Sequence, residues 1–324
     1  MRFLASGMAA ATGGTLAGPD ATVDGAGIDS RLVQPGQLFV PVIAERDGHG
    51  WIDAALAAGA AAYLTSRDPL GGTAVVVADT RDALLALGAM ARTRLPDRVV
   101  GVTGSVGKTT VKDLLAAVLG RQWRTAASAR SFNNELGVPL TLLNAAAGTE
   151  AAVVEMGARA PGDVATLCSV ARPNVGVVTR VAGAHTETFA TLDAVADAKA
   201  ELVEALPSAG TAVLNATDPR VASMAGRTDA RTVLYGDGGD VTAEEVRLDD
   251  ELRPAFRLCS PDGVATVHLA VRGRHQVENA LAAAAAALAS GVSLDAVAVG
   301  LGQAALSPWR MQLGRSPAGA LILN

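Results

Sequence analysis

The sequence predicts an α/β protein with a small N-terminal α/β domain and a larger central domain built on a mostly parallel sheet. Short apolar runs alternate with helical patterns, which is typical of parallel strands covered by helices. Residues 241–271 instead alternate polar and apolar side chains around turns, which predicts antiparallel strands inserted on the central core. A length of 324 residues suffices for about two domains.

The predicted strands are the apolar runs at residues 60–65, 74–79, 99–103, 152–155, 175–178 and 211–215. The helix after the third run has apolar residues at i, i+3, i+4, i+7 and i+8, namely Val111, Leu114, Leu115, Val118 and Leu119, and Gly120 is placed to end it. Thr191 can cap a second helix that Pro207 stops. The alanine-rich stretch 280–289 predicts a tightly packed helix.

Composition disfavours two classes of protein. With 27 Lys and Arg against 32 Asp and Glu, the net charge is −5, which does not suit a nucleic-acid binder. Five Phe, three Trp and two Tyr leave few rings for stacking bases. No apolar run approaches the roughly 18 residues of a membrane-spanning helix. Cys168 and Cys259 lack metal or redox spacing, so we expect a cytoplasmic protein without nucleic-acid partner or membrane insertion.

The strongest motif is Gly101-Val102-Thr103-Gly104-Ser105-Val106-Gly107-Lys108-Thr109-Thr110, between a predicted strand and a predicted helix. In a phosphate-binding loop, glycines let backbone N–H groups approach the phosphates, and the helix N-terminus adds positive potential. The lysine neutralises charge and the following threonine can bind magnesium. The usual consensus has glycine at the position of Val102, and this chain has its extra glycine at Gly104. The motif predicts a P-loop ATPase domain that binds ATP or GTP.

Three other residues are candidates for the same site. Glu155 ends a predicted strand, where it is either a magnesium ligand or a solvated cap. His185 follows the strand at 175–178 and is either structural or part of a metal or phosphate site. Helical spacing puts Lys199 on the apolar face of its helix. Its ammonium then snorkels, which is the ordinary outcome, or pairs with an acid or phosphate, or becomes an amine able to react with carbon dioxide.

Several separate segments resemble the ATP-dependent Mur ligases of peptidoglycan synthesis. They are the loop at 103–110, Ser131-Phe132-Asn133-Asn134-Glu135-Leu136-Gly137-Val138-Pro139-Leu140 and Glu155-Met156-Gly157-Ala158. Segments 27–31, 36–40 and 47–49 are similar to the nucleotide-sugar-binding domain of these ligases. Within the family, residues 132–139 resemble the MurF branch, which joins D-Ala-D-Ala to UDP-MurNAc-tripeptide through an acyl phosphate.

The resemblance implies ATP, two magnesium ions and a carbamylated Lys199. The residues that the resemblance implies for catalysis are Lys108, Lys199, His185 and Asn134. Those implied for nucleotide binding are Gly104, Ser105, Val106, Gly107, Lys108, Thr109, Thr110, Asn279 and Arg310. Magnesium ligands would be Thr109, Glu155, His185 and Lys199, and the sugar-peptide substrate would contact Ser30, Arg31, Asn133 and Asn134. Two departures from the family pattern are Arg180 and Gln276, each at a position where relatives have Asn.

The resemblance also implies a domain plan. Residues 1–96 are expected to bind the UDP-sugar-peptide and residues 97–314 to bind ATP, and residues 315–324 read as the first strand of a third domain that turnover requires. The expected protein is a monomeric ATP-dependent acid–amino-acid ligase, and residues 1–324 are expected to be inactive without the third domain. The alternatives are a related ligase with another amine substrate and a nucleotide-binding protein that performs no ligation. A generic kinase or GTPase would give residues 133–135 no role.

Overall fold

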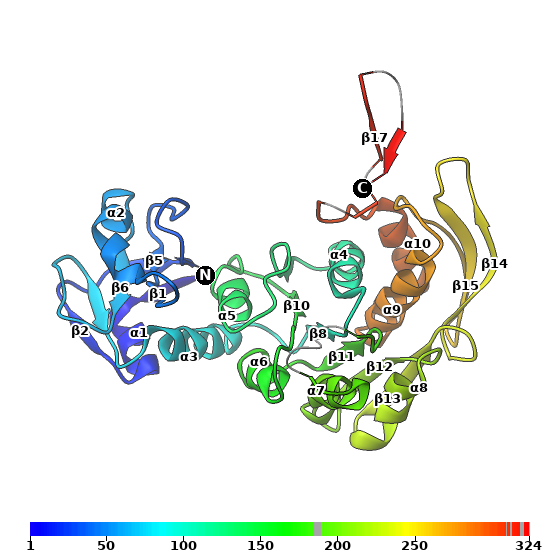
Figure 1. Ribbon diagram of the computed structural model, residues 1–324, viewed down its shortest axis with the longest axis horizontal. Helices are drawn as coiled ribbons and strands as arrows, with labels where there is room; N and C mark the ends of the chain where they lie inside the picture. The colour runs from blue at the N-terminus through cyan, green and yellow to red at the C-terminus, as the bar shows by residue number, and fades with distance from the viewer. Residues whose placement is uncertain (184–188, 309, 312, 318–320, 324) are drawn as a thin grey trace. The chain divides into compact units, whose positions relative to one another are not determined.

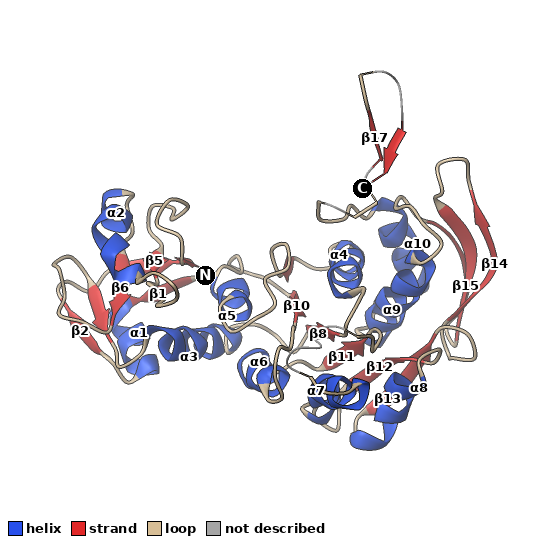
Figure 2. Cartoon of the chain, viewed as in Figure 1, coloured by secondary structure: helices blue, strands red, loops and turns tan. Residues whose placement is uncertain are grey.

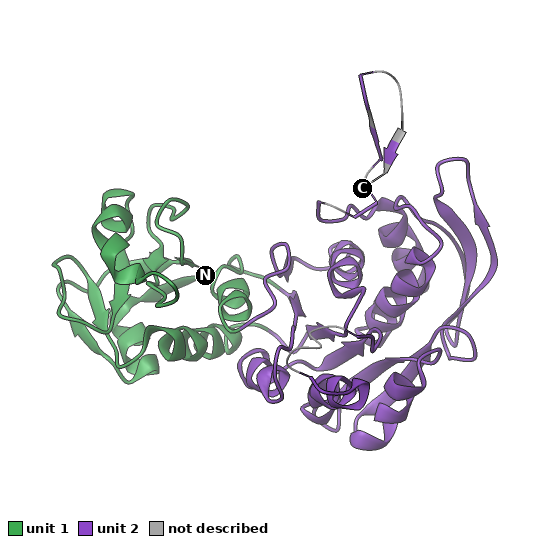
Figure 3. Cartoon of the chain, viewed as in Figure 1, with its two compact units in different colours: residues 1–95, 135–149 green, residues 96–134, 150–324 purple. Residues whose placement is uncertain are grey.

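A computed structural model describes residues 1–183, 189–308, 310–311, 313–317 and 321–323. The chain forms two compact units (Figure 3). Unit 1 comprises Met1–Leu95 and Glu135–Thr149, and unit 2 comprises Pro96–Asn134 and Glu150–Asn324. The chain therefore returns to unit 1 for 135–149 after unit 2 has begun, an excursion that no composition change in the sequence marks.

Unit 1 is built on a five-stranded sheet of order β2-β7-β6-β5-β4, in which β2 runs antiparallel to β7 and the other pairs are parallel. Unit 1 also contains a separate two-stranded antiparallel sheet, in which β1 pairs with β3. The elements are β1 (Arg2–Leu4), α1 (Ala5–Thr12), β2 (Thr15–Ala17), β3 (Thr22–Asp24), β4 (Ala26–Gly27), β5 (Leu38–Phe39), η1 (Gly48–Trp51), α2 (Ile52–Ala57), β6 (Ala62–Thr65), β7 (Ala74–Val76), α3 (Thr80–Arg92) and α5 (Gly137–Leu143).

Unit 2 contains a parallel six-stranded sheet of order β13-β12-β11-β8-β10-β9 (Figure 2). The parallel α/β core predicted from the sequence is confirmed. Its elements are β8 (Val99–Thr103), α4 (Lys108–Leu119), β9 (Thr125–Ala127), β10 (Ala151–Glu155), α6 (Asp163–Ala171), β11 (Val175–Val178), α7 (Leu192–Glu204), β12 (Thr211–Asn215), α8 (Pro219–Ala222), η2 (Ser223–Arg227), β13 (Arg231–Tyr235), α9 (Gln276–Ala289) and α10 (Leu294–Gln303).

Helices cover both faces of this sheet because successive side chains of a strand point to opposite faces. Val177 packs in the core under α4, α9 and α10, and the next residue, Val178, packs against α7 and α8 on the other face. Figure 1 shows these two helical layers on either side of β8, β11 and β12. The Thr191 side chain accepts a hydrogen bond from the Ala194 N–H at 3.1 Å, which confirms the predicted cap of α7.

The stretch with alternating polarity forms the antiparallel sheet β14-β15-β16, as predicted. Its strands are β14 (Thr242–Leu248), β15 (Pro254–Ser260) and β16 (Gly263–His268), and a final hairpin pairs β17 (Leu313–Arg315) with β18 (Leu321–Leu323). Phe256, Leu258 and Val267 extend the core formed by α4, α9 and α10. No helix in the described part of the chain is long and apolar enough to span a membrane.

The packing of α4 against α10 gives a first prediction. A Cβ added at Gly300 would lie 2.7 Å from the Val118 Cα, so the two helix backbones would have to separate. We expect Gly300→Ala to lower the free energy of unfolding by about 1–3 kcal/mol. The control is Gly226→Ala, where a Cβ meets nothing within 4 Å, and it should change stability by less than about 0.5 kcal/mol. Calorimetric unfolding checks both variants, and equal effects would contradict the packing argument.

Candidate functional site

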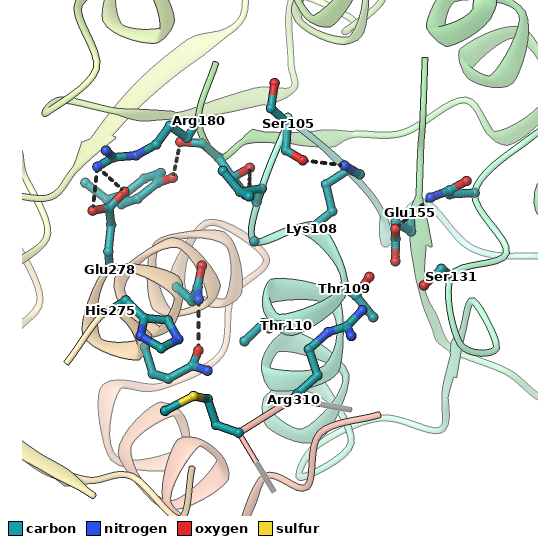
Figure 4. A pocket seen from close by; sticks show the side chains of 18 residues that line it. Ser105, Lys108, Thr109, Thr110, Ser131, Glu155, Arg180, His275, Glu278 and Arg310 are labelled. Carbon is teal, nitrogen blue, oxygen red and sulfur yellow. Dashed lines mark hydrogen bonds and ion pairs between the residues drawn. The ribbon is translucent and has the colours of Figure 1, made fainter. Parts of the chain in front are cut away.

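The candidate site lies where the carboxyl ends of three neighbouring parallel strands meet. β8 is paired with β11 on one side and β10 on the other. The chain runs from β8 to β9 at the edge of the sheet, returns to β10, and then crosses β8 to reach β11, so the direction of the connections reverses here. Ligands bind at such a switch point in open α/β sheets. A cavity of about 860 Å³ opens there (Figure 4). Its lining residues are Ser105, Val106, Gly107, Lys108, Thr109, Thr110, Ser131, Asn133, Glu155, Thr179, Arg180, Tyr235, His275, Gln276, Glu278, Asn279, Arg310 and Met311.

The loop from β8 to α4 needs glycine at two positions. Gly104 and Gly107 have φ values of +138° and +88°, in the range where side chains are strained. A Cβ at Gly104 would lie 2.0 Å from the Thr179 Oγ1, and one at Gly107 would lie 2.6 Å from the Asn279 Oδ1. The glycines therefore let β11 and α9 approach the loop closely.

Lys108 is the first residue of α4 and folds back over the loop. Its ammonium donates to the Gly104 carbonyl at 2.6 Å and to the Ser105 carbonyl at 3.2 Å. Burial lowers the pKa of Lys108, and the Glu155 carboxylate opposes this shift. The first N–H groups of a helix have no acceptor within the helix, so the lysine and the N-terminus of α4 present positive charge to one end of the cavity.

The segment after β11 supports the loop from the other side. The Thr179 hydroxyl donates to the Val106 carbonyl at 2.6 Å, and the Ser105 N–H donates to the Arg180 carbonyl at 2.7 Å. The Ser105 hydroxyl donates to the Ala182 carbonyl at 2.9 Å and accepts from the Ala182 N–H at 3.0 Å. The loop is thus held in place by contacts from the protein itself.

Glu155 ends β10 with its carboxylate in the cavity. It is 1% exposed, and Oε1 accepts a hydrogen bond from the Asn133 Nδ2 at 2.9 Å. Oε2 is buried and has no partner among the described residues. A buried carboxylate oxygen without a hydrogen bond is costly, and divalent cations satisfy such oxygens. Thr109 lines the same cavity with its hydroxyl side chain, so this pair fits a hard cation such as magnesium.

The N-terminus of α9 forms the opposite wall, where Asn279 donates to the Gln276 Oε1 at 2.8 Å. Beside it, Glu278 accepts from the Arg180 Nη2 at 2.9 and 3.0 Å and from the Asn215 Nδ2 at 2.6 Å. Asn215 is completely buried, whereas the Arg180 side chain is 45% exposed. This network of Arg180, Glu278 and Asn215 ties α9 to the ends of β11 and β12.

Lys199 is buried in α7, at 3% exposure, as its position on the apolar face predicted. Burial, with a further contribution from the Lys108 charge, lowers its pKa from 10.5 to about 8. The snorkelling interpretation is therefore wrong for this lysine. Glu201 and Asp163 partly offset the shift.

The structure brings the residues 105–110 together with Asn133, Glu155, Asn279 and Arg310 around one cavity. Asn134 and Lys199 are not among its described lining residues. Ser30 and Arg31 lie in unit 1, where the Arg31 side chain donates to Asp29 and holds the pKa of that carboxyl at about 2. His185 lies outside the described residues. Among the described residues no cluster of three His, Cys, Asp or Glu side chains forms a metal site.

Sequence reasoning missed Tyr235 and the network of Arg180, Glu278 and Asn215. Arg180 and Glu278 are 98 residues apart, and neither lies in a pattern that indicates a partner. The departure from the family pattern at Arg180 was the one available signal, because it adds a positive charge at this edge of the sheet that an acid can pair with.

The network gives a second prediction. The bond from Glu278 to buried Asn215 involves a charge and should contribute about 1.5–3 kcal/mol, whereas the bond to half-exposed Arg180 should contribute at most about 1 kcal/mol. We expect Glu278→Ala to lower the free energy of unfolding by about 2–3 kcal/mol and Arg180→Ala by less than about 1 kcal/mol. Urea unfolding measures both, and a larger loss for Arg180→Ala would contradict the assignment.

Lys199 gives a third prediction, on pH dependence. Below about pH 8 Lys199 is charged in both the folded and the unfolded chain, so its buried charge destabilises the fold in full. Between about pH 8 and 10.5 the unfolded chain binds more protons than the folded chain. The destabilisation of the fold by Lys199 therefore fades as pH rises through this range. We expect Lys199→Met to raise the free energy of unfolding by roughly 2–3 kcal/mol at pH 7. The gain should shrink towards pH 10.5.

Urea unfolding at pH 7 and pH 10 measures this difference. Lys199→Arg is the matched control because arginine stays charged at both pH values. A stabilisation by Lys199→Met that is the same at both pH values would contradict the buried-ammonium assignment.

Comparisons with known proteins agree with this geometry. Residues 102–287 match the family model of the Mur ligase middle domain. The chain is 41% identical over 324 aligned residues to the UDP-N-acetylmuramoyl-tripeptide--D-alanyl-D-alanine ligase of Mycobacterium tuberculosis; the alignment covers 91% of this chain and 63% of that protein. The chain thus spans less than two thirds of that relative's length.

Two crystal structures are similar to the chain over most of its length. MurF from Acinetobacter baumannii matches with a TM-score of 0.91 and 31% identity, over 100% of this chain and 72% of that one. MurF ligase from Thermotoga maritima in complex with ADP matches with a TM-score of 0.79 and 30% identity, over 91% of this chain and 69% of that one. The family model covers more than half of the residues, and the phosphate loop, Glu155 and the α9 wall lie within it, so the chain belongs to the Mur ligase family.

Proposed function

We propose that this chain is an ATP-dependent acid–amino-acid ligase of peptidoglycan synthesis that joins D-Ala-D-Ala to UDP-MurNAc-tripeptide. One observation carries the proposal: the loop with Lys108 and the partnerless oxygen of Glu155 face a single cavity at the sheet's switch point. The similarity to ligases of that name and to the ADP complex of one of them supports it.

The nucleotide would bind by its phosphates. The Ser105 N–H already donates to the Arg180 carbonyl, and the other backbone N–H groups of the loop, together with the N-terminus of α4, suit phosphate oxygens. Lys108 would exchange its bonds to the Gly104 and Ser105 carbonyls for bonds to the β- and γ-phosphates. Asn279 and Arg310 line the opposite part of the cavity and would contact the rest of the nucleotide.

Thr109 and Glu155 would hold one magnesium ion, which would neutralise the negative charge of the phosphates during phosphoryl transfer. For a second ion we propose His185 and a carbamylated Lys199. A neutral amine is needed for carbamylation: its nitrogen bonds to the carbon of carbon dioxide and loses a proton. The burial of Lys199 and its lowered pKa support this, because they favour the neutral amine near pH 8.

The proposed ligation has two steps. A carboxylate oxygen of the tripeptide attacks the γ-phosphorus, and ADP leaves to give an acyl phosphate. The amine of D-Ala-D-Ala then attacks the acyl carbon, phosphate leaves, and the nitrogen loses a proton. Catalysis is mainly positioning and charge neutralisation. We propose Asn133 and Asn134 at the acyl phosphate, and Ser30 and Arg31 at the uridine diphosphate, in a monomeric cytoplasmic enzyme.

The fourth prediction tests nucleotide binding and carboxyl activation separately. Calorimetry with a non-hydrolysable ATP analogue and magnesium should show binding that Lys108→Met weakens about tenfold or more. The turnover assay uses the chain extended by the third domain that the family resemblance implies. With ATP, magnesium and UDP-MurNAc-tripeptide, hydroxylamine should trap the acyl phosphate as a hydroxamate that mass spectrometry detects. Addition of D-Ala-D-Ala should give the amide instead.

The outcomes separate the candidate functions. Absence of nucleotide binding would overturn the proposal entirely. Nucleotide binding without hydroxamate or amide from the extended chain would favour the nucleotide-binding protein that performs no ligation. Hydroxamate with no amide from D-Ala-D-Ala, but with amide from another amine, would favour a related ligase.

A further inference from the structure

A buried ion pair lies in α4 outside the described cavity lining. Lys112 and Asp113 follow the phosphate loop by one turn of the helix, and their side chains are 2% and 11% exposed. The Lys112 Nζ is 2.8 Å from the Asp113 Oδ1. Neither residue belongs to the motifs discussed above, and the proposed chemistry gives them no role.

Lys112 fixes the segment that follows β9. Its ammonium donates to the Ser128 carbonyl at 2.8 Å and to the Arg130 carbonyl at 2.9 Å, so all three of its protons have acceptors. The same segment continues to Ser131 and Asn133, which line the cavity. Asn133 in turn donates to Glu155.

Asp113 fixes a second segment, which comes from the far end of the sequence. Its Oδ2 accepts from the Ser307 N–H at 2.7 Å, and its Oδ1 accepts from the Ser307 hydroxyl at 3.1 Å. Three residues later, Arg310 lines the cavity, and its side chain points towards Thr109 (Figure 4). The ion pair therefore ties two cavity walls to the helix that carries the phosphate loop.

The choice of residue types supports a positioning role. A buried ion pair is a weak source of stability, but it defines geometry when every proton and lone pair has a partner. Only three of the 27 basic residues are lysines, namely Lys108, Lys112 and Lys199. A compact ammonium suits three acceptors around one point, whereas the planar guanidinium of arginine does not.

We propose that Asp113 is a positioning residue that places Arg310 against the bound nucleotide through Ser307. The proposal rests on the proposed nucleotide site. It differs from a purely structural role because it requires the effect of Asp113 on binding to pass through Arg310.

A double-mutant cycle tests this. Calorimetry with the non-hydrolysable ATP analogue and magnesium gives the Kd for the unmodified chain, Asp113→Asn, Arg310→Ala and the double variant. We expect Asp113→Asn to raise the Kd about tenfold. In the Arg310→Ala background, Asp113→Asn should raise the Kd no further. An unchanged Kd for Asp113→Asn, or the same increase in both backgrounds, would overturn the proposal.

Two further variants keep the test decisive. Ser307→Ala loses the hydroxyl bond and keeps the N–H bond, so it should raise the Kd about threefold in the same cycle, even if Asp113→Asn does not fold. Asp249→Asn is the control, because Asp249 accepts from two backbone N–H groups and a cationic side chain, whereas neither it nor its partners Glu251 and Arg253 line the cavity. Its Kd should equal that of the unmodified chain.

A second measurement is independent of the nucleotide. Amide hydrogen exchange of the peptide 305–311 should be faster in Asp113→Asn than in Asp249→Asn, and equal exchange would overturn the proposal. If the unmodified chain binds no nucleotide, the proposed function fails, whereas the exchange rates still decide whether Asp113 holds this segment.

Discussion

The candidate site depends on one steric constraint, the approach of β11 to the phosphate loop at Gly104. A Cβ at that position would lie 2.0 Å from the Thr179 Oγ1, so no other residue fits without separating the two. Because the contact is so close, the Thr179 hydroxyl can donate to the Val106 carbonyl and the Ser105 N–H can reach the Arg180 carbonyl. The loop is therefore preorganised by its neighbour, and a ligand need not bring the order itself.

This constraint also concentrates charge at one edge of the sheet. Burial lowers the pKa of both Lys108 and Lys199, and the Lys108 charge lowers the pKa of Lys199 further, whereas Glu155 opposes the shift at Lys108. The partnerless Glu155 oxygen adds an unsatisfied negative group to the same site. Buried charges without a full set of partners destabilise the fold, and they are common at sites that bind phosphates and cations. Stability in unit 2 comes instead from the apolar layers on the two sheet faces.

Local patterns were sufficient for the elements that bury a complete face. The strands β8, β11 and β12 and the helices α4 and α7 have continuous or periodic apolar residues, which is why their positions could be predicted. β9 and β13 were missed: β9 is a short edge strand with half-buried side chains, and β13 has partly exposed positions. The return of 135–149 to unit 1 was also missed, because packing between distant segments leaves no local signal.

The sequence by itself determined the parallel α/β core, the phosphate loop and the presence of a carboxylate at the end of β10, because each depends on neighbours along the chain. Only the tertiary structure decided which residues share the cavity. Arg180 meets Glu278 across 98 positions, and Asp113 meets Ser307 across 194. These contacts are decided by strand order and helix packing, which bring distant residues within hydrogen-bond distance. The burial of Lys199, which is the main cause of its lowered pKa, could be expected from its helix face, whereas the further contribution of the Lys108 charge depends on the tertiary structure.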